Sequence, residues 1–380
     1  MRNCRICREE LAQADYLANS RAITSLSTMI DSRTEVYVCR SCGHAQSPDL
    51  PDVQAFYDHE YRISLQSDDH DQLYSMEADG PVFRTVHQAK LLMDLDICKG
   101  ANMLDFGAAK ATTTRHFLKL RPDVRPYVFD VSEDYCNHWD EWIARDAQAT
   151  YELPDQWAGC FDLITLHFVL EHVEDPIKTL KYISKFLSSN GRIFFTVPDP
   201  ISNSGDLLVV DHLNHFVPSS LQYAVEAADL SIVALRSDLF RGAYVVVAQK
   251  GKQFVPNPVK NQIVDVLTLL TEWRHILDNF YTDLTPFNAE VKKVAVYGAG
   301  FYGALFSSMI EDDIVCFLDR NPHLQGTKVN GIPVLAPKGC PDVDLVIAAL
   351  NPAKARDILP RDADWLPKSA QVIYPRASPR

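Results

Sequence analysis

Residues 161–198 constrain the fold of this chain more than any other stretch. Asp162 is followed by an apolar run that is typical of a strand buried on both faces, comprising Leu163, Ile164, Leu166 and Phe168. Asp175-Pro176 then begins a helix, with the aspartate as its cap and the proline in its first turn. Residues 188–191 end that helix, and residues 192–197 form a second apolar strand. The order strand, helix, strand predicts one βαβ unit of a parallel sheet.

The length and charge of the chain limit the classes of protein to consider. At 380 residues it exceeds one ordinary core and suggests two or three domains. Its formal net charge of −13 argues against a general affinity for nucleic acid or for an anionic membrane. The sequence has no run of about 18 apolar residues to span a membrane, and its start, MRNCRICREE, lacks the apolar segment of a signal peptide. We therefore expect a cytoplasmic protein, in which thiols stay reduced.

Four of the nine cysteines form two CxxC pairs, Cys4 with Cys7 and Cys39 with Cys42. A CxxC turn presents two thiolates to one tetrahedral zinc ion, and a second pair brought alongside by a hairpin completes the site. Gly43, directly after the second pair, suits the tight turn. Two disulfides or a redox-active CxxC are alternatives that a reducing compartment disfavours. A site made only of cysteines has no open position, so we expect the zinc to be structural.

A pattern typical of an adenosyl-binding site lies in the middle of the chain. Residues 102–107 read as a buried strand that ends in a glycine and leads into a helix over residues 112–120. The next strand, residues 126–131, carries Asp130, which lies 25 residues after Asp105. The glycine lets the backbone approach a ligand, and the later carboxylate accepts hydrogen bonds from both hydroxyls of a ribose. An ordinary βα turn is the alternative. A dinucleotide is less expected, because the turn sequence GAAKA makes a poor cradle for a pyrophosphate.

The segments FDLIT, VLEHVEDP and FLSSNGRIFFTVPD resemble the fourth and fifth strands of class I S-adenosylmethionine-dependent methyltransferases. The resemblance implies an α/β fold with a Rossmann-like methyltransferase sheet, and S-adenosylmethionine as the cofactor. It implies that Asp105 orients the turn and the amino-acid end of the cofactor, and that Asp130 takes the ribose. The turn at Gly107 and Ala109 and, at the end of the fourth strand, His167 complete the implied cofactor site. Several glycines are usual in this turn, and only the first is present.

Further elements are expected around this site. A helix over residues 133–144 and a short strand near residues 149–151 lead to the opening stretch. Pro218 begins a helix and residues 231–235 form the next strand, in a pattern that resembles the methyltransferase superfamily.

The segment after the fifth strand concentrates polar side chains in five positions, with Asp211, His212, Asn214 and His215. Ligands of such folds bind just beyond the carboxyl ends of the strands. The segment resembles the YHEHxSYFS stretch of sugar C-methyltransferases, in which a histidine is proposed as the base. His212 and Asp211 match the second histidine and the glutamate of that stretch, so both are candidate catalytic residues; His215 also reads as structural. Val209 replaces the tyrosine, which leaves transfer to carbon or to oxygen open.

Two more residues are candidates for the chemistry. His172, in LEHVEDP, reads either as a base or as a cap at the strand end. Tyr61 lies in a polar segment after the second CxxC pair, which is either a surface loop or a lid over the cofactor. A zinc knuckle followed by such a segment resembles the N-terminal module of the sugar C-methyltransferases, where a tyrosine approaches the active site.

The last third of the chain predicts a long helix and a second Rossmann-like fold. Apolar residues recur at helical spacing over residues 263–280, in a face that we expect to dock on this protein. Residues 294–303 form a strand that runs into GxGxxG, and Asp319 closes the next strand. This pattern matches a dinucleotide fingerprint, so an NAD site is one interpretation. The segment FLDRNPHLQGTKVNGIPVLAP instead resembles small domains that handle nucleotide sugars, and the same zinc–methyltransferase family ends in such a domain. A purely architectural role is the third interpretation.

Together these patterns predict four regions. They are a zinc-binding module with a lid segment (residues 1–85), a methyltransferase domain (86–250), a linker with a long helix (251–290) and a small Rossmann-like domain (291–380). We expect an S-adenosylmethionine-dependent methyltransferase that acts on a small molecule, such as a nucleotide-linked or modified sugar. An NAD-dependent oxidoreductase and a non-catalytic binding or regulatory protein are the alternatives. Neither a nucleic-acid partner nor a membrane partner is expected.

Overall fold

The computed structural model describes residues 2–18, 22–50, 71–251, 259–285, 287, 293–310 and 314–377. The chain divides into two compact units and passes between them several times. The first unit contains residues 1–11, 39–202 and 213–263, and the second contains residues 12–38, 203–212 and 264–380. The four regions expected from the sequence remain a prediction. Within the described ranges, no helix has both the length and the apolar character needed to cross a membrane.

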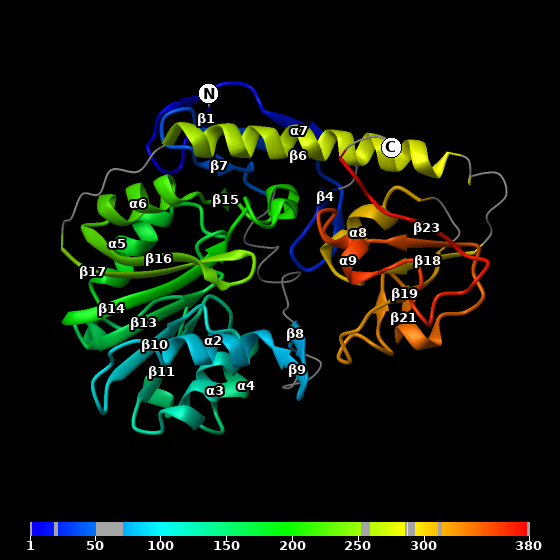
Figure 1. The fold of residues 1–380 in the computed structure, drawn as a ribbon. Helices are drawn as coiled ribbons and strands as arrows, with labels where there is room; N and C mark the ends of the chain where they lie inside the picture. The colour runs from blue at the N-terminus through cyan, green and yellow to red at the C-terminus, as the bar shows by residue number, and fades with distance from the viewer. Residues whose placement is uncertain are drawn as a thin grey trace. The chain divides into compact units, whose positions relative to one another are not determined.

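A seven-stranded sheet forms the centre of the first unit, in the order β12-β11-β10-β13-β14-β17-β16 (Figure 1). The strands from β12 to β14 are parallel, and β17 and β16 extend the sheet in antiparallel pairing. The bounds are β10 (Asn102–Phe106), β11 (Arg125–Asp130), β12 (Gln148–Thr150), β13 (Phe161–His167), β14 (Leu187–Pro198), β16 (Leu230–Phe240) and β17 (Ala243–Lys250). Most residues of the central strands β10 and β13 are buried, as expected for strands covered on both faces.

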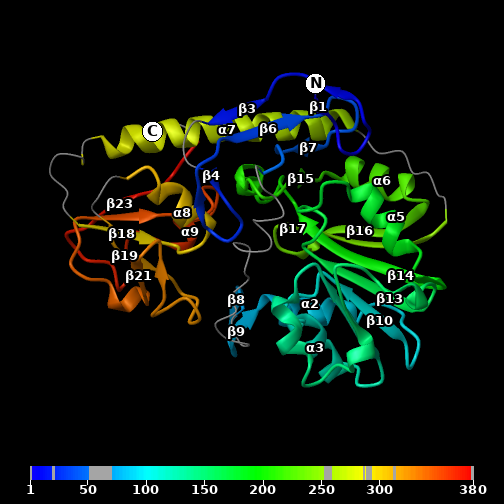
Figure 2. The same ribbon diagram turned by 180° about the vertical axis from the view of Figure 1, so that it is seen from behind.

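Helices cover both faces of this sheet (Figures 1 and 2). One face carries α2 (Arg84–Leu92) and α3 (Thr112–Leu120), and the other carries α5 (Pro176–Ser184) and α6 (Pro218–Ala227). The core under the first pair of helices includes Leu92, Met103, Phe117, Leu163 and Phe194. The sheet is therefore doubly wound, and the carboxyl ends of its parallel strands lie at one edge.

The predicted βαβ unit is confirmed. The side chain of Asp175 accepts a hydrogen bond of 2.9 Å from the backbone amide of Lys178, so it caps α5 as expected. β13 and β14 pair in parallel. β14 begins earlier than expected, at Leu187, and residues 188–191 lie within it as an irregularity, because Leu187 pairs with Phe161 while Arg192 pairs with Leu163.

The helix predicted over residues 133–144 is wrong in length. Only a 3-10 turn, η2 (Glu133–Tyr135), and α4 (Cys136–Trp139) form there. The carbonyl oxygen of His138, which would continue the helical ladder, instead accepts hydrogen bonds from the indole of Trp142 (2.7 Å) and from the side chain of Arg115 (3.1 Å). Side-chain packing therefore ends the helix early.

Short elements complete the first unit. They are β1 (Arg2–Asn3) paired with β2 (Glu10–Leu11), β7 (Ala45–Gln46) paired with β15 (Asn214–His215), the hairpin β8 (Leu73–Glu77) and β9 (Gly80–Phe83), and the turns η3 (Arg145–Ala147) and η4 (Asp155–Trp157). The antiparallel pairing of β7 with β15 joins the residues after the second CxxC pair to the polar segment that follows β14.

The second unit contains a six-stranded sheet in the order β20-β21-β19-β18-β22-β23, parallel except for β20. The bounds are β18 (Val294–Tyr297), β19 (Ile314–Leu318), β20 (Lys328–Val329), β21 (Ile332–Leu335), β22 (Leu345–Ala348) and β23 (Gln371–Ile373), with α8 (Phe301–Ser307), η6 (Pro337–Gly339) and α9 (Ala355–Ile358). The predicted Rossmann-like pattern of strand, glycine turn, helix and strand is therefore present.

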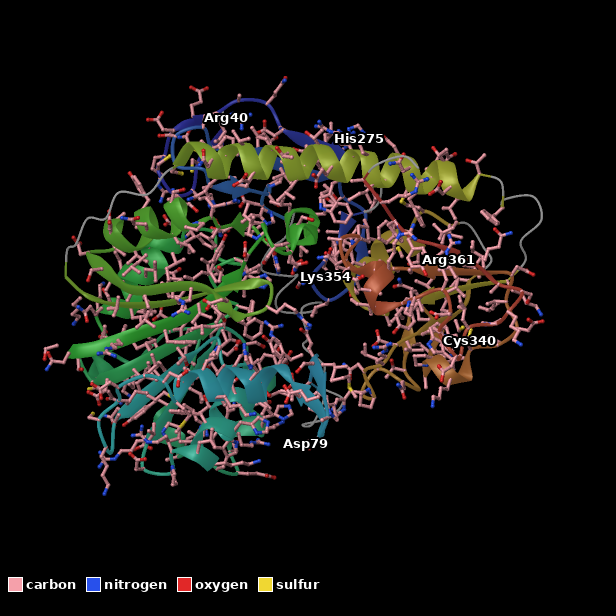
Figure 3. All side chains as sticks on the ribbon, viewed as in Figure 1. Arg40, Asp79, His275, Cys340, Lys354 and Arg361 are labelled. Atoms are coloured by element: carbon pink, nitrogen blue, oxygen red, sulfur yellow. The ribbon has the colours of Figure 1, made fainter. Side chains whose placement is uncertain are left out.

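The same unit holds β3 (Tyr16–Ala18) paired with β6 (Thr34–Val38), β4 (Ala22–Ile23) paired with β5 (Met29–Ile30), η5 (Ser204–Leu208) and most of α7 (Val259–Leu284). Trp273 and Phe280 of α7 are fully buried, and the indole of Trp273 donates a 2.9 Å hydrogen bond to the carbonyl oxygen of Ser204. His275 lies on the exposed face of α7 (Figure 3). The expected docking of this amphipathic helix on its own protein is confirmed.

Candidate functional site

The turn after β10 lies at the carboxyl edge of the first unit's sheet. Gly107 has a φ of +76° there, a conformation that side chains rarely adopt. A Cβ atom at this position would lie 2.6 Å from Cγ2 of Val169, which follows β13. Backbone conformation and space therefore both require glycine, and Val169 packs directly on the turn.

Two alanines in this turn also have left-handed backbones. Ala109 has a φ of +46° and Ala111 a φ of +53°. The peptide groups of Ala109 are held on both sides: its amide donates to Oδ2 of Asp130 (2.8 Å), and its carbonyl oxygen accepts from the indole of Trp139 (2.8 Å). Surrounding contacts thus maintain a strained backbone at the place where the sequence predicts a ligand.

Asp105 is buried under the turn. Its carboxylate accepts hydrogen bonds from the hydroxyls of Thr114 on α3 (2.6 Å) and Thr165 on β13 (3.0 Å). Burial raises the pKa of Asp105, and these two hydrogen bonds oppose that shift. Asp105 therefore ties β10, α3 and β13 together, as expected of a residue that orients the turn. Neither threonine was predicted as a partner of Asp105. The sequence indicated only that one lies in a helix and the other in a strand.

Asp130 ends β11 beside the turn. One carboxylate oxygen accepts from the amide of Ala109 and the other from the amide of Ser132 (3.2 Å). Burial raises the pKa of Asp130 to about 6. Each carboxylate oxygen has a further lone pair, so the residue can still accept hydrogen bonds from a pair of ligand hydroxyls.

Two apolar side chains follow the strands next to this acid. Val131 comes directly after β11 and is 53% exposed, and Tyr151 comes directly after β12 and is 59% exposed. The amide of Tyr151 donates to the carbonyl oxygen of Asp130 (3.0 Å), which places the two strand ends together. Exposed apolar surface beside the carboxylate of Asp130 could accommodate a flat, apolar group such as a nucleobase.

His167 ends β13, next to β10 in the sheet. Both of its ring nitrogens are buried, and neither has a hydrogen-bond partner among the described residues. Burial lowers the pKa of His167 to about 3, with the charge of Arg84 acting in the same direction, so the ring is neutral. The next residue, Phe168, has a φ of +58°, and the guanidinium of Arg84 lies 3.7 Å from the centre of its ring. A neutral imidazole with two unsatisfied nitrogens at a sheet edge is suited to hydrogen bonding with a ligand.

The segment after β13 carries Glu171, which is fully buried, and His172, which is half-buried. The amide of His172 closes a turn on the carbonyl oxygen of Val169 (3.0 Å). Asp105, Gly107, Ala109, Asp130, His167 and His172 all belong to the first unit. Tyr61 lies outside the described residues.

The two other candidate catalytic residues belong to the second unit. Nδ1 of His212 lies 2.6 Å from Oδ1 of Asp206, a carboxylate that the sequence analysis missed and that no local pattern marks. Asp211 accepts hydrogen bonds from the amide and the hydroxyl of Ser25, both of 2.6 Å. His215, in the first unit, is fully buried with Nε2 3.0 Å from the hydroxyl of Ser47, in agreement with its structural interpretation.

The four predicted metal ligands lie together. Their Sγ atoms are all within 4.8 Å of one another, with separations of 3.6 Å for Cys4 and Cys42 and 3.4 Å for Cys7 and Cys39. All four cysteines are free of disulfides. Tetrahedral thiolates around zinc are separated by about 3.8 Å, so the four sulfur atoms fit such an ion.

The two CxxC turns have the same backbone geometry. In each, the first cysteine's carbonyl oxygen accepts from the amide four residues later, which belongs to Arg8 or to Gly43. In each, the first sulfur accepts from the amide two residues later, at 3.4 Å. Hydrogen bonding among the thiols raises the pKa of Cys4 to about 12 and lowers that of Cys39. Cys4 therefore stays a protonated thiol unless a cation stabilises its thiolate, and four sulfur atoms this close together are arranged so that they could bind one divalent metal.

The strand order of the sheet, with its antiparallel last pair, and the carboxyl-edge site define a class I methyltransferase fold. Residues 82–235 match the family model of a methyltransferase domain. No curated protein matches the chain.

Solved structures similar to this chain include three methyltransferases. One is from Haloferax volcanii, in complex with the activator Trm112 (16% identity, TM-score 0.38, covering 44% of this chain and 91% of that chain). Another is an S-adenosylmethionine-dependent methyltransferase from Aquifex aeolicus (14% identity, TM-score 0.36, covering 42% of this chain and 88% of that chain). The third is a 1,6-didemethyltoxoflavin N1-methyltransferase from Burkholderia thailandensis (18% identity, TM-score 0.35, covering 44% of this chain and 79% of that chain).

Proposed function

We propose that this protein is an S-adenosylmethionine-dependent methyltransferase whose cofactor binds at the carboxyl edge of β10, β11 and β13. The observation that supports it most is the pairing of Asp130 with the Gly107–Ala109 turn, beside exposed apolar side chains. When bound, the sulfonium cofactor supplies an activated methyl group. Asp130 holds the ribose, Val131 and Tyr151 cover the adenine, and His167 hydrogen-bonds the methionine end or the substrate.

The test is calorimetric titration of the purified protein with S-adenosylhomocysteine and, separately, with NAD. We expect S-adenosylhomocysteine to bind with a Kd in the micromolar range. Binding of NAD alone would favour the oxidoreductase alternative, and binding of neither would favour a non-catalytic protein.

The acceptor is proposed to be a small molecule from which His212 removes a proton. A histidine hydrogen-bonded through Nδ1 to a carboxylate is held in the tautomer in which Nε2 is the unprotonated, basic nitrogen. Asp206 supplies that carboxylate. We expect His212→Ala to lower kcat at least about a hundredfold while it leaves the Kd for S-adenosylhomocysteine within about twofold. Equal loss of cofactor binding would contradict the assignment of His212 as a base.

Zinc is proposed as the metal of the four-cysteine site, in a structural role. The support is the all-sulfur ligand set and the two matching knuckles. We expect about one zinc ion per chain by elemental analysis, and loss of the metal together with a lower melting temperature in Cys39→Ser. A Cys98→Ser variant is the control, because Cys98 is an exposed thiol outside the site.

The substrate is proposed to carry a nucleotide that the second unit's Rossmann-like sheet binds. The amide of Ala299 donates to Oδ2 of Asp319 at 2.8 Å, the same contact that Ala109 makes with Asp130. A Cβ atom on Gly300 would meet nothing within 4 Å, so the backbone there is open to a ligand. We expect a nucleoside diphosphate to bind, and Asp319→Asn to weaken it. NAD binding with no affinity for nucleoside diphosphates or their sugars would contradict this proposal.

A further inference from the structure

The segment after β13, residues 169–175, is attached to the two CxxC turns at several points within the first unit. The side-chain amide of Asn214 donates to three carbonyl oxygens of the adjoining chain, those of Leu170 (3.1 Å), Glu171 (3.4 Å) and Val173 (2.6 Å). The backbone amide of Asn214 also donates to the carbonyl oxygen of Glu171 (3.0 Å). One fully buried asparagine therefore satisfies three of the seven backbone carbonyl oxygens in this segment.

The orientation of Asn214 is set from the second CxxC turn. His44 comes two residues after Cys42, and its carbonyl oxygen accepts from the amide of Cys39 (2.8 Å). Its Nε2 lies 3.2 Å from Oδ1 of Asn214, inside a fully buried environment. A donor on the amide oxygen directs the amide nitrogen towards the segment.

The first CxxC turn holds the far end of the segment. The guanidinium of Arg8 pairs with Asp175, the cap of α5, at 2.5 Å. Arg8 is the residue whose amide closes that turn on Cys4. Both CxxC turns are thus linked to residues 170–175, the first directly through Arg8 and the second through His44 and Asn214.

The segment in turn packs on the cofactor turn. Val169 lies so close to Gly107 that a Cβ atom there would be 2.6 Å from its side chain. We propose that the metal-bound knuckles act as a clamp, with Asn214 as the positioning residue, that holds residues 169–175 against the cofactor turn. The inference rests on the proposed function in naming the ligand and the metal; the contacts themselves are independent of it.

The affinity test compares Asn214→Ala with Ser219→Ala. Ser219 is a matched control, because its buried hydroxyl donates to the carbonyl oxygen of Cys42 in the second CxxC turn (2.8 Å), and its amide donates to the side-chain oxygen of Gln262 and not to residues 169–175. We expect the Kd for S-adenosylhomocysteine to rise about tenfold or more in Asn214→Ala and to stay within about twofold in Ser219→Ala, with zinc content unchanged in both. Asn214→Asp retains the oxygen that accepts from His44 but loses the side-chain N–H groups that donate to residues 170–173. Its Kd for S-adenosylhomocysteine should therefore rise as much as in Asn214→Ala. A folded, zinc-loaded Asn214→Asp with normal affinity would overturn the proposal.

Hydrogen exchange of the wild-type chain tests the clamp without any ligand. We expect removal of zinc by a chelator to speed exchange in the peptide covering residues 168–175, and re-addition of zinc to restore its protection. Unchanged exchange in this peptide after zinc removal would contradict the clamp. Failure of the wild-type protein to bind S-adenosylhomocysteine would count against the proposed function alone, since the exchange measurement reads the clamp separately.

Discussion

Asp130 is the residue on which the proposed cofactor chemistry most depends. Its carboxylate is buried between the strand end and the turn, and its pKa is raised to about 6, chiefly by that burial. Ribose hydroxyls donate hydrogen bonds, so they favour the ionised carboxylate, whereas the buried environment favours the protonated one. The two requirements oppose each other, and they predict measurable pH effects of opposite sign.

The first prediction concerns cofactor affinity. Below pH 6 Asp130 is mostly protonated, so the Kd for S-adenosylhomocysteine should rise by up to about fivefold between pH 6 and pH 5. In Asp130→Asn the affinity should be at least about tenfold lower at pH 7 and nearly independent of pH in this range. Calorimetry between pH 5 and pH 8 gives both curves. An unchanged pH profile in the variant would remove Asp130 from the site.

Stability should change in the other direction. The folded pKa of about 6 exceeds the ordinary value of 3.8, so between these values the folded state holds a proton that the unfolded state has lost. Lowering the pH from 7 towards 4 should therefore stabilise the fold through this residue, by on the order of 2–3 kcal/mol. Asp130→Asn should raise the unfolding free energy at pH 7 and remove this contribution, as urea titration at several pH values would show.

Ala109 illustrates backbone strain at the same turn. Alanine at a φ of +46° is disfavoured, whereas glycine adopts it freely. We expect Ala109→Gly to raise the unfolding free energy by up to about 1 kcal/mol. Ala108→Gly is the matched control, since Ala108 is not among the residues with positive φ, and it should lower the unfolding free energy by about 0.5–1 kcal/mol. Destabilisation of similar size in both variants would show that the turn carries no such strain.

At the scale of elements, the glycines at the turn between β18 and α8 differ in how much space surrounds them. A Cβ atom on Gly303 would lie 2.2 Å from the carbonyl oxygen of Gly298, and one on Gly298 would lie 2.4 Å from that of Ala349. These two glycines are required for packing. Gly300 has open space around it, so packing does not explain its presence, and under the proposed function it allows close approach of the substrate's nucleotide.

This difference predicts opposite phenotypes for two alanine substitutions. Gly303→Ala should lower the unfolding free energy by about 1–3 kcal/mol, because the backbone must shift to admit the methyl group. Gly300→Ala should leave stability within about 0.5 kcal/mol and weaken nucleoside diphosphate binding. Thermal unfolding and calorimetry would measure the two effects, and equal stability losses would contradict the assignment of Gly300 to a ligand.

At the scale of the whole molecule, the chain repeats one local device in its two units. In the first unit the acid lies 21 residues after the amide that it accepts from, and in the second it lies 20 residues after. Asp130 is the last residue of β11 and Asp319 directly follows β19, and each lies next to a turn with a positive φ at its first glycine. One chain therefore carries the same amide–carboxylate contact in both units, and the proposed function assigns one contact to the cofactor site and the other to the substrate site.

The assignment predicts separable effects. Asp130→Asn should weaken S-adenosylhomocysteine and leave nucleoside diphosphate binding within about twofold, and Asp319→Asn should do the reverse. The double variant should show both losses, approximately additive in free energy. Titration of the three variants with each ligand would decide it. Loss of both ligands in either single variant would indicate that the two acids serve one site.

The sequence by itself determined the features that depend on near neighbours along the chain. Asp175-Pro176 begins a helix because a cap and its amide are three residues apart, and each CxxC turn places two thiols together. Strand periodicity located the βαβ unit and both acids at strand ends, since burial on two faces requires continuous apolar residues.

Only the tertiary structure decided which distant side chains meet. Asp206 as the partner of His212, the two threonines on Asp105 and the attachment of Asn214 to residues 170–173 depend on folded proximity, which no local pattern records. The early end of α4, at Trp139, also depends on distant side chains. The side chains of Arg115 and Trp142 donate to the carbonyl oxygen of His138, which the periodicity had placed within a longer helix. Local sequence sets which backbone conformations are accessible, and the free energy of burying and pairing groups far apart in the chain selects among them.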